Sequence, residues 1–238
     1  MSSITLPQLT VETAGLETVT LDLYRDIHKG IRYELFGVTL AAGQVDPGDR
    51  DAVAAVAARW RNLVGLLITH AEHEDGFVQS VIELHAPALA EVIAAAHPEL
   101  EAQMAALEVL AERATDAGVC ERRLAVHRMY LGFASFTAAY LQHQEFEEMQ
   151  VMPVLAAALG FDQVLGINGA IIGSITPEEM VQSGSVMLPA MNVEDRVELL
   201  GGAQAGAPPE VFAGMMGLTQ VVISPADYAQ VAARLGVA

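Results

Sequence analysis

Apolar positions recur at alternating steps of three and four residues along the first two thirds of the chain, which is the spacing of one face of an α-helix. Four such faces follow one another, and turn signals at Asp46-Pro47-Gly48-Asp49, His85-Ala86-Pro87 and Gly118 separate them. We expect the first helix over residues 19–45, a long second helix ending before Pro87, a third ending at Gly118, and a fourth from about Val119 through Val154. Short connections between long helices imply antiparallel neighbours, so the pattern predicts an all-α, up-down-up-down four-helix bundle.

The pattern changes after Gly160, where glycines, methionines and short apolar stretches replace the long periodic segments. Helix starts are still signalled by a capping box at Thr176-Pro177-Glu178-Glu179, by Asn192 before an acidic turn, and by Ser224-Pro225. We expect three or four short helices with apolar faces too numerous to leave in water, packed on the bundle or on a second subunit of a homodimer. The predicted domains are a bundle over residues 17–158 and a C-terminal helical extension over residues 165–238.

Composition and charge narrow the function. The chain is 53% apolar but only 5% aromatic, which favours packed helices over sheets. No apolar run reaches the roughly 18 uncharged residues of a membrane span, and the first residues do not resemble an export signal, so we expect a cytoplasmic protein without a membrane partner. A net charge of −18 without a basic stripe argues against nucleic acid. The single cysteine, Cys120, excludes an internal disulfide and a thiolate zinc cluster, so any metal must bind histidine and carboxylate.

Each of the four apolar faces is interrupted near its middle by a histidine: His28, His70, His97 and His143. On three of the faces a glutamate stands four residues after the histidine: Glu74, Glu101 and Glu147. A step of four turns about 40° around a helix and rises about 6 Å, so both side chains of each pair point from one face at one level. Each pair is therefore a potential chelate.

Burying several histidines and carboxylates costs several kcal/mol for each unpaired charge, and no basic residue interrupts these faces. Metal cations would neutralise the acids. Imidazole with carboxylate suits iron, manganese or zinc, and six or seven such ligands are more than one ion needs, so two ions are implied. The Glu-x-x-His motif of ferritin-like bundles is absent, and so is a zincin helix, because His73-Glu74 is not followed by a second histidine.

These residues resemble the hemerythrin and HHE cation-binding proteins, whose pattern over four helices is His, His-x-x-x-Glu, His, His-x-x-x-Glu. The pattern here reads His28, His70-Ala71-Glu72-His73-Glu74, His97 and His143-Gln144-Glu145-Phe146-Glu147, over about residues 17 to 158. The intervals also resemble those of the iron-sensing F-box member of that family.

The resemblance implies two non-haem iron ions with an oxo or hydroxo bridge. His28 and His70 would bind one iron, His97 and His143 the other, and Glu74 and Glu147 would bridge them. The family's oxygen carriers have a histidine where this sequence has Glu101. We place Glu101 in the predicted metal set, either as a carboxylate ligand or as a solvated neighbour.

The remaining histidines are predicted to be structural, with His73 at the surface beside the apolar face, His85 in a loop and His127 on the outer face. Tyr24 and Tyr140 stand one turn before His28 and His143, and either donate to a ligand or only pack. Glu145 and Glu148 are predicted to lie on a solvated face.

A pair of irons with open coordination positions can bind dioxygen, peroxide or nitric oxide. The leading prediction is a non-haem di-iron protein that binds or reacts with these small species, including catalase-like peroxide breakdown. No catalytic base or nucleophile is evident outside the ligand set, so the sequence leaves open whether the protein is an enzyme. The alternatives are an iron- or oxygen-responsive sensor module, whose extension transmits the change, and a di-iron oxygenase with an organic substrate between bundle and extension.

Overall fold

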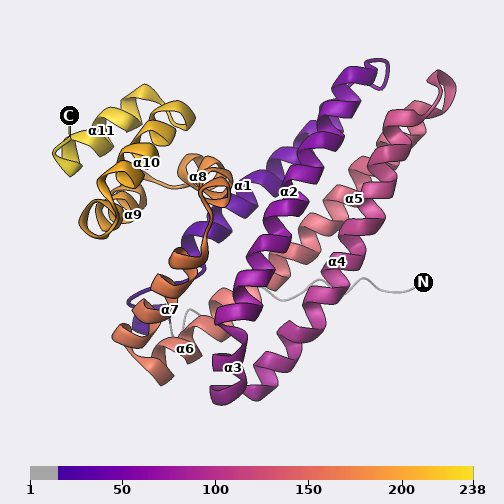
Figure 1. The fold of residues 1–238 in the computed structure, drawn as a ribbon. Coiled ribbons are helices and arrows are strands. Elements are labelled where there is room, and N and C mark those ends of the chain that lie inside the picture. Colours follow the sequence, from indigo (N-terminus) through magenta and orange to yellow (C-terminus); the bar gives the residue numbers. More distant parts are fainter. Residues whose placement is uncertain (1–15, 238) are drawn as a thin grey trace.

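The computed structural model describes residues 16–237, and within them every regular element is helical, as predicted. The long helices are α1 (Arg25–Gln44), α2 (Arg50–Phe77), α4 (Pro87–Asp116) and α5 (Val119–Phe146). In Figure 1 they lie side by side, and each packs on two others: α1 and α4 both contact α2 and α5. This arrangement encloses one apolar core, in which the Trp60 and Phe133 rings stack at 4.5 Å.

The first helix begins at Arg25, about six residues later than the apolar spacing predicts. From residue 16 up to this start, the one regular element is a short 3-10 turn at Leu16–Thr18. The Asp22 carboxylate accepts hydrogen bonds from the backbone N–H groups of Tyr24 and Arg25 and so satisfies two of the donors that a helix start leaves free. The prediction of a helix from residue 19 is therefore wrong, although Leu21 and Leu23 still pack against the core.

The second helix ends at Phe77 rather than running to His85. The chain turns at Val78 and continues as the short helix α3 (Gln79–His85). Gly76, a poor helix former, stands next to the break. The turn carries Val78 and Ile82 into a second apolar cluster at this end of the bundle.

The fourth helix is interrupted as well. After α5 the backbone forms a π-helical segment, η2 (Glu147–Val151), and then α6 (Met152–Leu159). Pro153 explains the interruption: it has no N–H to donate to the carbonyl of Met149, and its ring would crowd that carbonyl in an α-helix. Such wide turns are frequent at functional sites, and this one begins at a predicted ligand, Glu147.

The extension contains five helices within the described residues, rather than three or four: α7 (Phe161–Ser174), α8 (Pro177–Ala190), α9 (Val193–Gly206), α10 (Pro209–Val222) and α11 (Pro225–Leu235). The three predicted starts are confirmed. Thr176 and Glu179 form a reciprocal capping box, and Asn192 and Ser224 each accept from the backbone N–H three residues later.

The extension packs on the bundle through α8, which lies along α1. The contact is close at Gly30, where a Cβ atom would stand 3.0 Å from the backbone nitrogen of Met187. Lys29 and Arg25 of α1 add ion pairs to Asp195 and Glu198 of α9. Helices α8 to α11 share an apolar cluster of their own, and in Figure 1 α9 to α11 stand away from the bundle.

By length and apolarity alone, α2 could cross a membrane, as could the bent pair Val119–Leu159 and Phe161–Ser174 if it counted as one span. Core helices pass the same test. Since α2 supplies Trp60 and Leu67 to the buried core, its apolarity is explained by packing inside the protein.

Candidate metal centre

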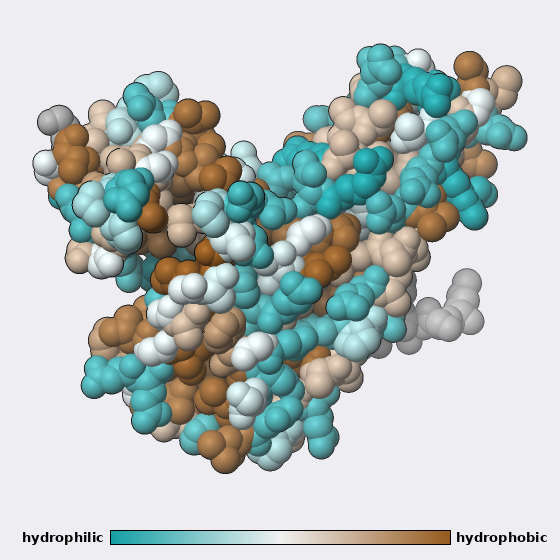
Figure 2. Space-filling view, viewed as in Figure 1, coloured by the Kyte–Doolittle hydropathy of each residue, from teal (hydrophilic) through white to brown (hydrophobic). Residues whose placement is uncertain are grey.

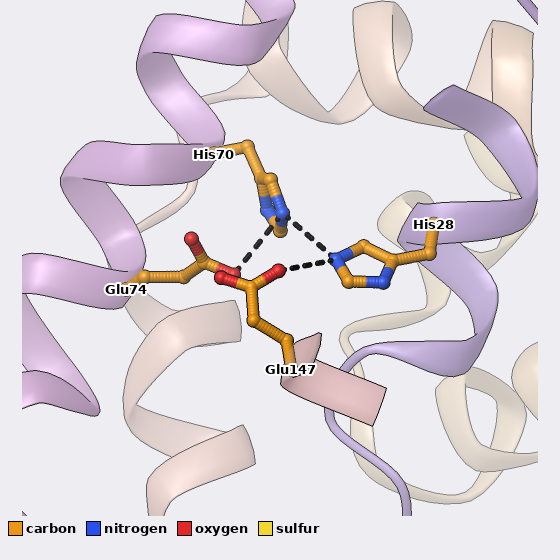
Figure 3. Close-up of side chains that lie close together, drawn as sticks. All are labelled: His28, His70, Glu74 and Glu147. Carbon is orange, nitrogen blue, oxygen red and sulfur yellow. Dashed lines mark hydrogen bonds and ion pairs between the residues drawn. The ribbon is translucent and has the colours of Figure 1, made fainter. Parts of the chain in front are cut away.

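Six of the seven predicted site residues converge in the middle of the bundle. Their ligand atoms form two groups, each within 4.8 Å: His28, His70, Glu74 and Glu147 in one, Glu74, His97, His143 and Glu147 in the other. Figure 3 shows the first group, in which the side chains of His28, His70, Glu74 and Glu147 point toward one another. Both glutamates belong to both groups, so the cluster has two lobes that share their carboxylates.

Each shared glutamate spans the two lobes with its two oxygens. Glu74 places Oε1 3.1 Å from His70 Nε2 and Oε2 3.4 Å from His97 Nε2. Glu147 places Oε1 3.0 Å from His143 Nε2 and Oε2 3.4 Å from His28 Nε2. A carboxylate that bridges two cations through its two oxygens has this arrangement, with one oxygen directed at each lobe.

The cluster is buried, with His28 at 0% and Glu147 at 1% exposure. Neither oxygen of Glu74 or of Glu147 accepts a well-formed hydrogen bond, and His97 Nε2 forms no well-formed hydrogen bond either. Buried carboxylates without donors cost several kcal/mol, so native proteins pair them or give them a cation. These side chains therefore fit a cation site.

The pKa values of the histidines in the cluster are shifted in different directions. Burial lowers the pKa of His70 and of His143 to about 4, so both are neutral at pH 7 and their ring nitrogens can ligate a metal. Burial opposes the charge on His97 too, but its contact with Glu74 is stronger in sum and raises the pKa of His97 to about 9.

The pKa values of the two glutamates are also shifted in opposite directions. Burial would raise the pKa of Glu74, but the histidines around it, His70 first, lower it to about 2. Burial and the charge of Glu74 raise the pKa of Glu147 well above its usual value. The raised pKa values of His97 and Glu147 favour their protonated forms in the metal-free cluster, and a cation bound there would compete with these protons.

Two further carboxylates, which are not part of the cluster, orient two of its histidines. Nδ1 of His28 donates to Glu148 Oε1 at 2.9 Å, and Nδ1 of His97 donates to Asp75 Oδ1 at 3.0 Å. Arg32 in turn donates two hydrogen bonds to Glu148, at 2.7 and 2.9 Å. Each contact holds the proton on Nδ1 and leaves Nε2 facing the cluster, the usual support of a metal-binding histidine.

The prediction that Glu148 lies on a solvated face is therefore wrong, and Asp75 was overlooked. The sequence does contain a signal: each shared glutamate is followed directly by an acidic residue, in Glu74-Asp75 and Glu147-Glu148. The neighbour of a core residue on a helix points about 100° away, which here brings Glu148 and Asp75 within reach of a histidine on another helix, although the Asp75 side chain is also exposed.

Two tyrosines also border the cluster. The Tyr24 ring lies 5.2 Å from that of His28, and the Tyr140 ring 5.7 Å from that of His143. Burial, together with the charges of Glu74 and Glu147, raises the pKa of both phenols well above 10, so both stay protonated. Both tyrosines are buried in the apolar core, close enough to Glu74 and Glu147 for these carboxylates to affect their pKa values.

Glu101 is not part of the cluster, which corrects its place in the predicted metal set. Its side chain is exposed, because the buried stripe of α4 runs through His97, Leu100 and Met104 and leaves residue 101 at the outer edge. The exposed position of Glu101 favours a solvated neighbour of the cluster over a metal ligand.

Of the other histidines, His127 is exposed, as predicted, and His73 is partly exposed. His85 is exposed too, but it is the last residue of α3, so the prediction that it lies in a loop is wrong. A buried polar residue next to the cluster was missed: Gln144 is fully buried beside His143, and neither atom of its side-chain amide has a hydrogen-bond partner. Its sequence position, directly after His143, gives no indication of burial.

The fold and the cluster together define a helical protein with a buried histidine and carboxylate site for cations. A family model for the hemerythrin HHE cation binding domain matches residues 19–160. The match covers more than half of the chain, so the protein belongs to the hemerythrin HHE cation-binding family, as the histidine and glutamate pattern predicts. Comparisons with curated proteins and with solved structures found no match.

Proposed function

We propose that the protein is a non-haem di-iron protein of hemerythrin type, with an antiparallel up-down-up-down bundle around its two metals. His28 and His70 would hold one iron, His97 and His143 the other, and Glu74 and Glu147 both. The observation that supports this most directly is the position of the two glutamates, each with one oxygen near a histidine of either lobe.

The donor set narrows the metal to iron, manganese or zinc, because it offers imidazole and carboxylate without thiolate. Iron is the one of these that the resemblance to the hemerythrin pattern implies. When bound, two irons supply electrons and open positions for dioxygen, peroxide or nitric oxide. We propose these small molecules as the ligands, with peroxide removal as a protective activity.

The chain's own residues would prepare the site in three ways. Asp75 and Glu148 hold the Nδ1 protons of His97 and His28, so that Nε2 is the ligating atom. The apolar core excludes bulk water, which strengthens every charge interaction in the cluster. Tyr140 keeps a phenolic proton next to His143 and would be a hydrogen-bond donor beside the metals.

The test is metal content together with the visible spectrum, in wild type and in a His70→Ala, His143→Ala double variant. We expect two irons per chain and a ferric absorption in wild type, and loss of both in the double variant. His127→Ala, an exposed histidine of α5, is the matched control and should behave as wild type. Absence of bound metal after anaerobic iron loading would contradict the proposal.

A second candidate, an iron-responsive sensor module, is favoured by the position of α8. That helix packs on α1 at Gly30, two residues after His28, so a shift of His28 on iron binding would reach the extension directly. Limited proteolysis with and without iron separates the candidates. Iron-dependent protection of residues 160–176 would favour the sensor, and peroxide turnover without such protection would favour the protective oxidoreductase.

A further inference from the structure

A cavity of about 180 Å³ adjoins the metal cluster on one side. It lies between α2, the residues at the start of α1, and the extension helices α7 and α8. His70 and Glu74 form part of its wall, as does Tyr24, whereas His97 and His143 do not. The cavity therefore opens onto one lobe of the cluster, and the extension closes it.

The wall of the cavity is mainly apolar. Ile171 and Ile175 contribute from the extension, Leu66 from α2, Ile27 from α1 and Met187 from α8. Figure 2 shows apolar side chains gathered over α7, where this part of the wall reaches the surface. An apolar cavity of about 150 Å³ is large enough to hold benzene, so this one accommodates a molecule of about six to ten non-hydrogen atoms.

The charged side chains around the cavity narrow the kind of ligand that it can bind. The lining includes four carboxylates, Asp22, Asp26, Glu74 and Glu179, and contains neither lysine nor arginine. A carboxylate or phosphate ligand would meet repulsion from these side chains and would find no lysine or arginine to pair with. The lining also offers Thr69 and Asn168, which can form hydrogen bonds with one polar group of a neutral ligand.

We propose that this cavity is a binding site for a compact, neutral and mainly apolar organic molecule, seated against His70 and Glu74. A few convergent polar groups in a mainly apolar wall are typical of small-molecule sites. The inference deepens the proposed function, because such a ligand would lie beside the first-lobe cation. It rests on that function only for the presence of the cation, and the cavity itself is a property of the fold.

The experiment is calorimetric titration of the full-length protein, as purified, with indole and with benzoate. We expect one indole to bind per chain and benzoate to bind at least tenfold more weakly. Ile171→Trp, which fills the cavity, should weaken indole at least tenfold. Leu165→Trp is the control, because Leu165 is an exposed residue of the same helix outside the cavity, and it should leave indole binding unchanged.

A second variant, Ile175→Ala, keeps the test conclusive if Ile171→Trp fails to fold. Enlarging the cavity should shift the preference from indole toward the larger naphthalene. Indole binding that is unaffected by both Ile171→Trp and Ile175→Ala, or benzoate binding as tight as indole, would overturn the proposal. No indole binding at millimolar concentration in wild type would overturn it too.

Metal content measured on the same samples keeps the two proposals apart. Two irons per chain without indole binding would refute the cavity proposal alone. Indole binding that Ile171→Trp weakens, in protein that takes up no iron, would refute the di-iron proposal alone.

Discussion

Glu148 reaches His28 from the position directly after Glu147, and its Oε1 accepts a hydrogen bond from His28 Nδ1 at 2.9 Å. Asp75 does the same for His97 from the position directly after Glu74. The two halves of the bundle thus repeat one arrangement of two adjacent acids. The first acid spans both lobes of the cluster, and the second accepts a hydrogen bond from the Nδ1 of one histidine. The first acid would contact the cation and the second acid the imidazole.

Removing the second acid should weaken metal binding without unfolding the bundle. We expect Glu148→Gln to lower iron affinity by about 10- to 100-fold, because a neutral amide is a weaker acceptor for His28 Nδ1 than the carboxylate and orients the ring less firmly. Competition titration against a chelator measures the change. Glu145→Gln, an exposed glutamate one turn earlier, is the control, and equal affinities of the two variants would contradict the role of Glu148.

The equivalent change in the other half should act in the same way. Asp75→Asn leaves an amide that can still accept from His97 but carries no charge, so we expect a loss of affinity smaller than for Asp75→Ala. Glu72→Gln, exposed on the same turn of α2, should change nothing. The same chelator competition compares the three variants, and an Asp75→Ala protein with wild-type affinity would refute the prediction.

Glu147 should oppose the stability of the metal-free protein. It is buried, and neither oxygen has a hydrogen-bond donor, so Glu147→Met is expected to raise the free energy of unfolding of the metal-free chain by roughly 1–3 kcal/mol. The same variant should lose iron binding. Urea unfolding with chelator and with iron measures both effects, and a Glu147→Met chain less stable than wild type in chelator would contradict this view of the site.

Metal binding should release protons at neutral pH. His97 has a pKa of about 9, so it is protonated at pH 7 and must lose that proton to ligate a cation, and the raised pKa of Glu147 acts in the same direction. Affinity should therefore rise between pH 6 and pH 9. Calorimetry in buffers of different ionisation heat counts the protons, and pH-independent binding would show that both groups are already deprotonated in the free protein.

The contact between α1 and α8 should not tolerate a side chain at Gly30. A Cβ atom there would meet the Met187 backbone at 3.0–3.1 Å, and backbone yields less readily than a flexible side chain. We expect Gly30→Ala to speed proteolysis between α7 and α8 and to lower stability by about 1–3 kcal/mol. Gly65→Ala is the control, because its nearest neighbour, Gln182 Nε2, is at 3.6 Å, and equal proteolysis rates would contradict the prediction.

The sequence by itself determined the helical class, the four histidine-bearing faces and the caps of the extension. These features depend on residues three or four positions apart on one helix, and helix geometry is the same in every protein. His70 and Glu74, or His143 and Glu147, had to share a face wherever their helices packed.

The tertiary structure alone decided which residues at the edge of a face meet another helix. Glu101 and Glu148 both border a ligand, yet one is exposed and the other binds His28, because the neighbouring helix covers only one of those edges. The cavity beside His70 likewise requires α7 and α8, which follow it by about a hundred residues. Spacing along one helix carries no information on the distance between helices, so packing had to settle these points.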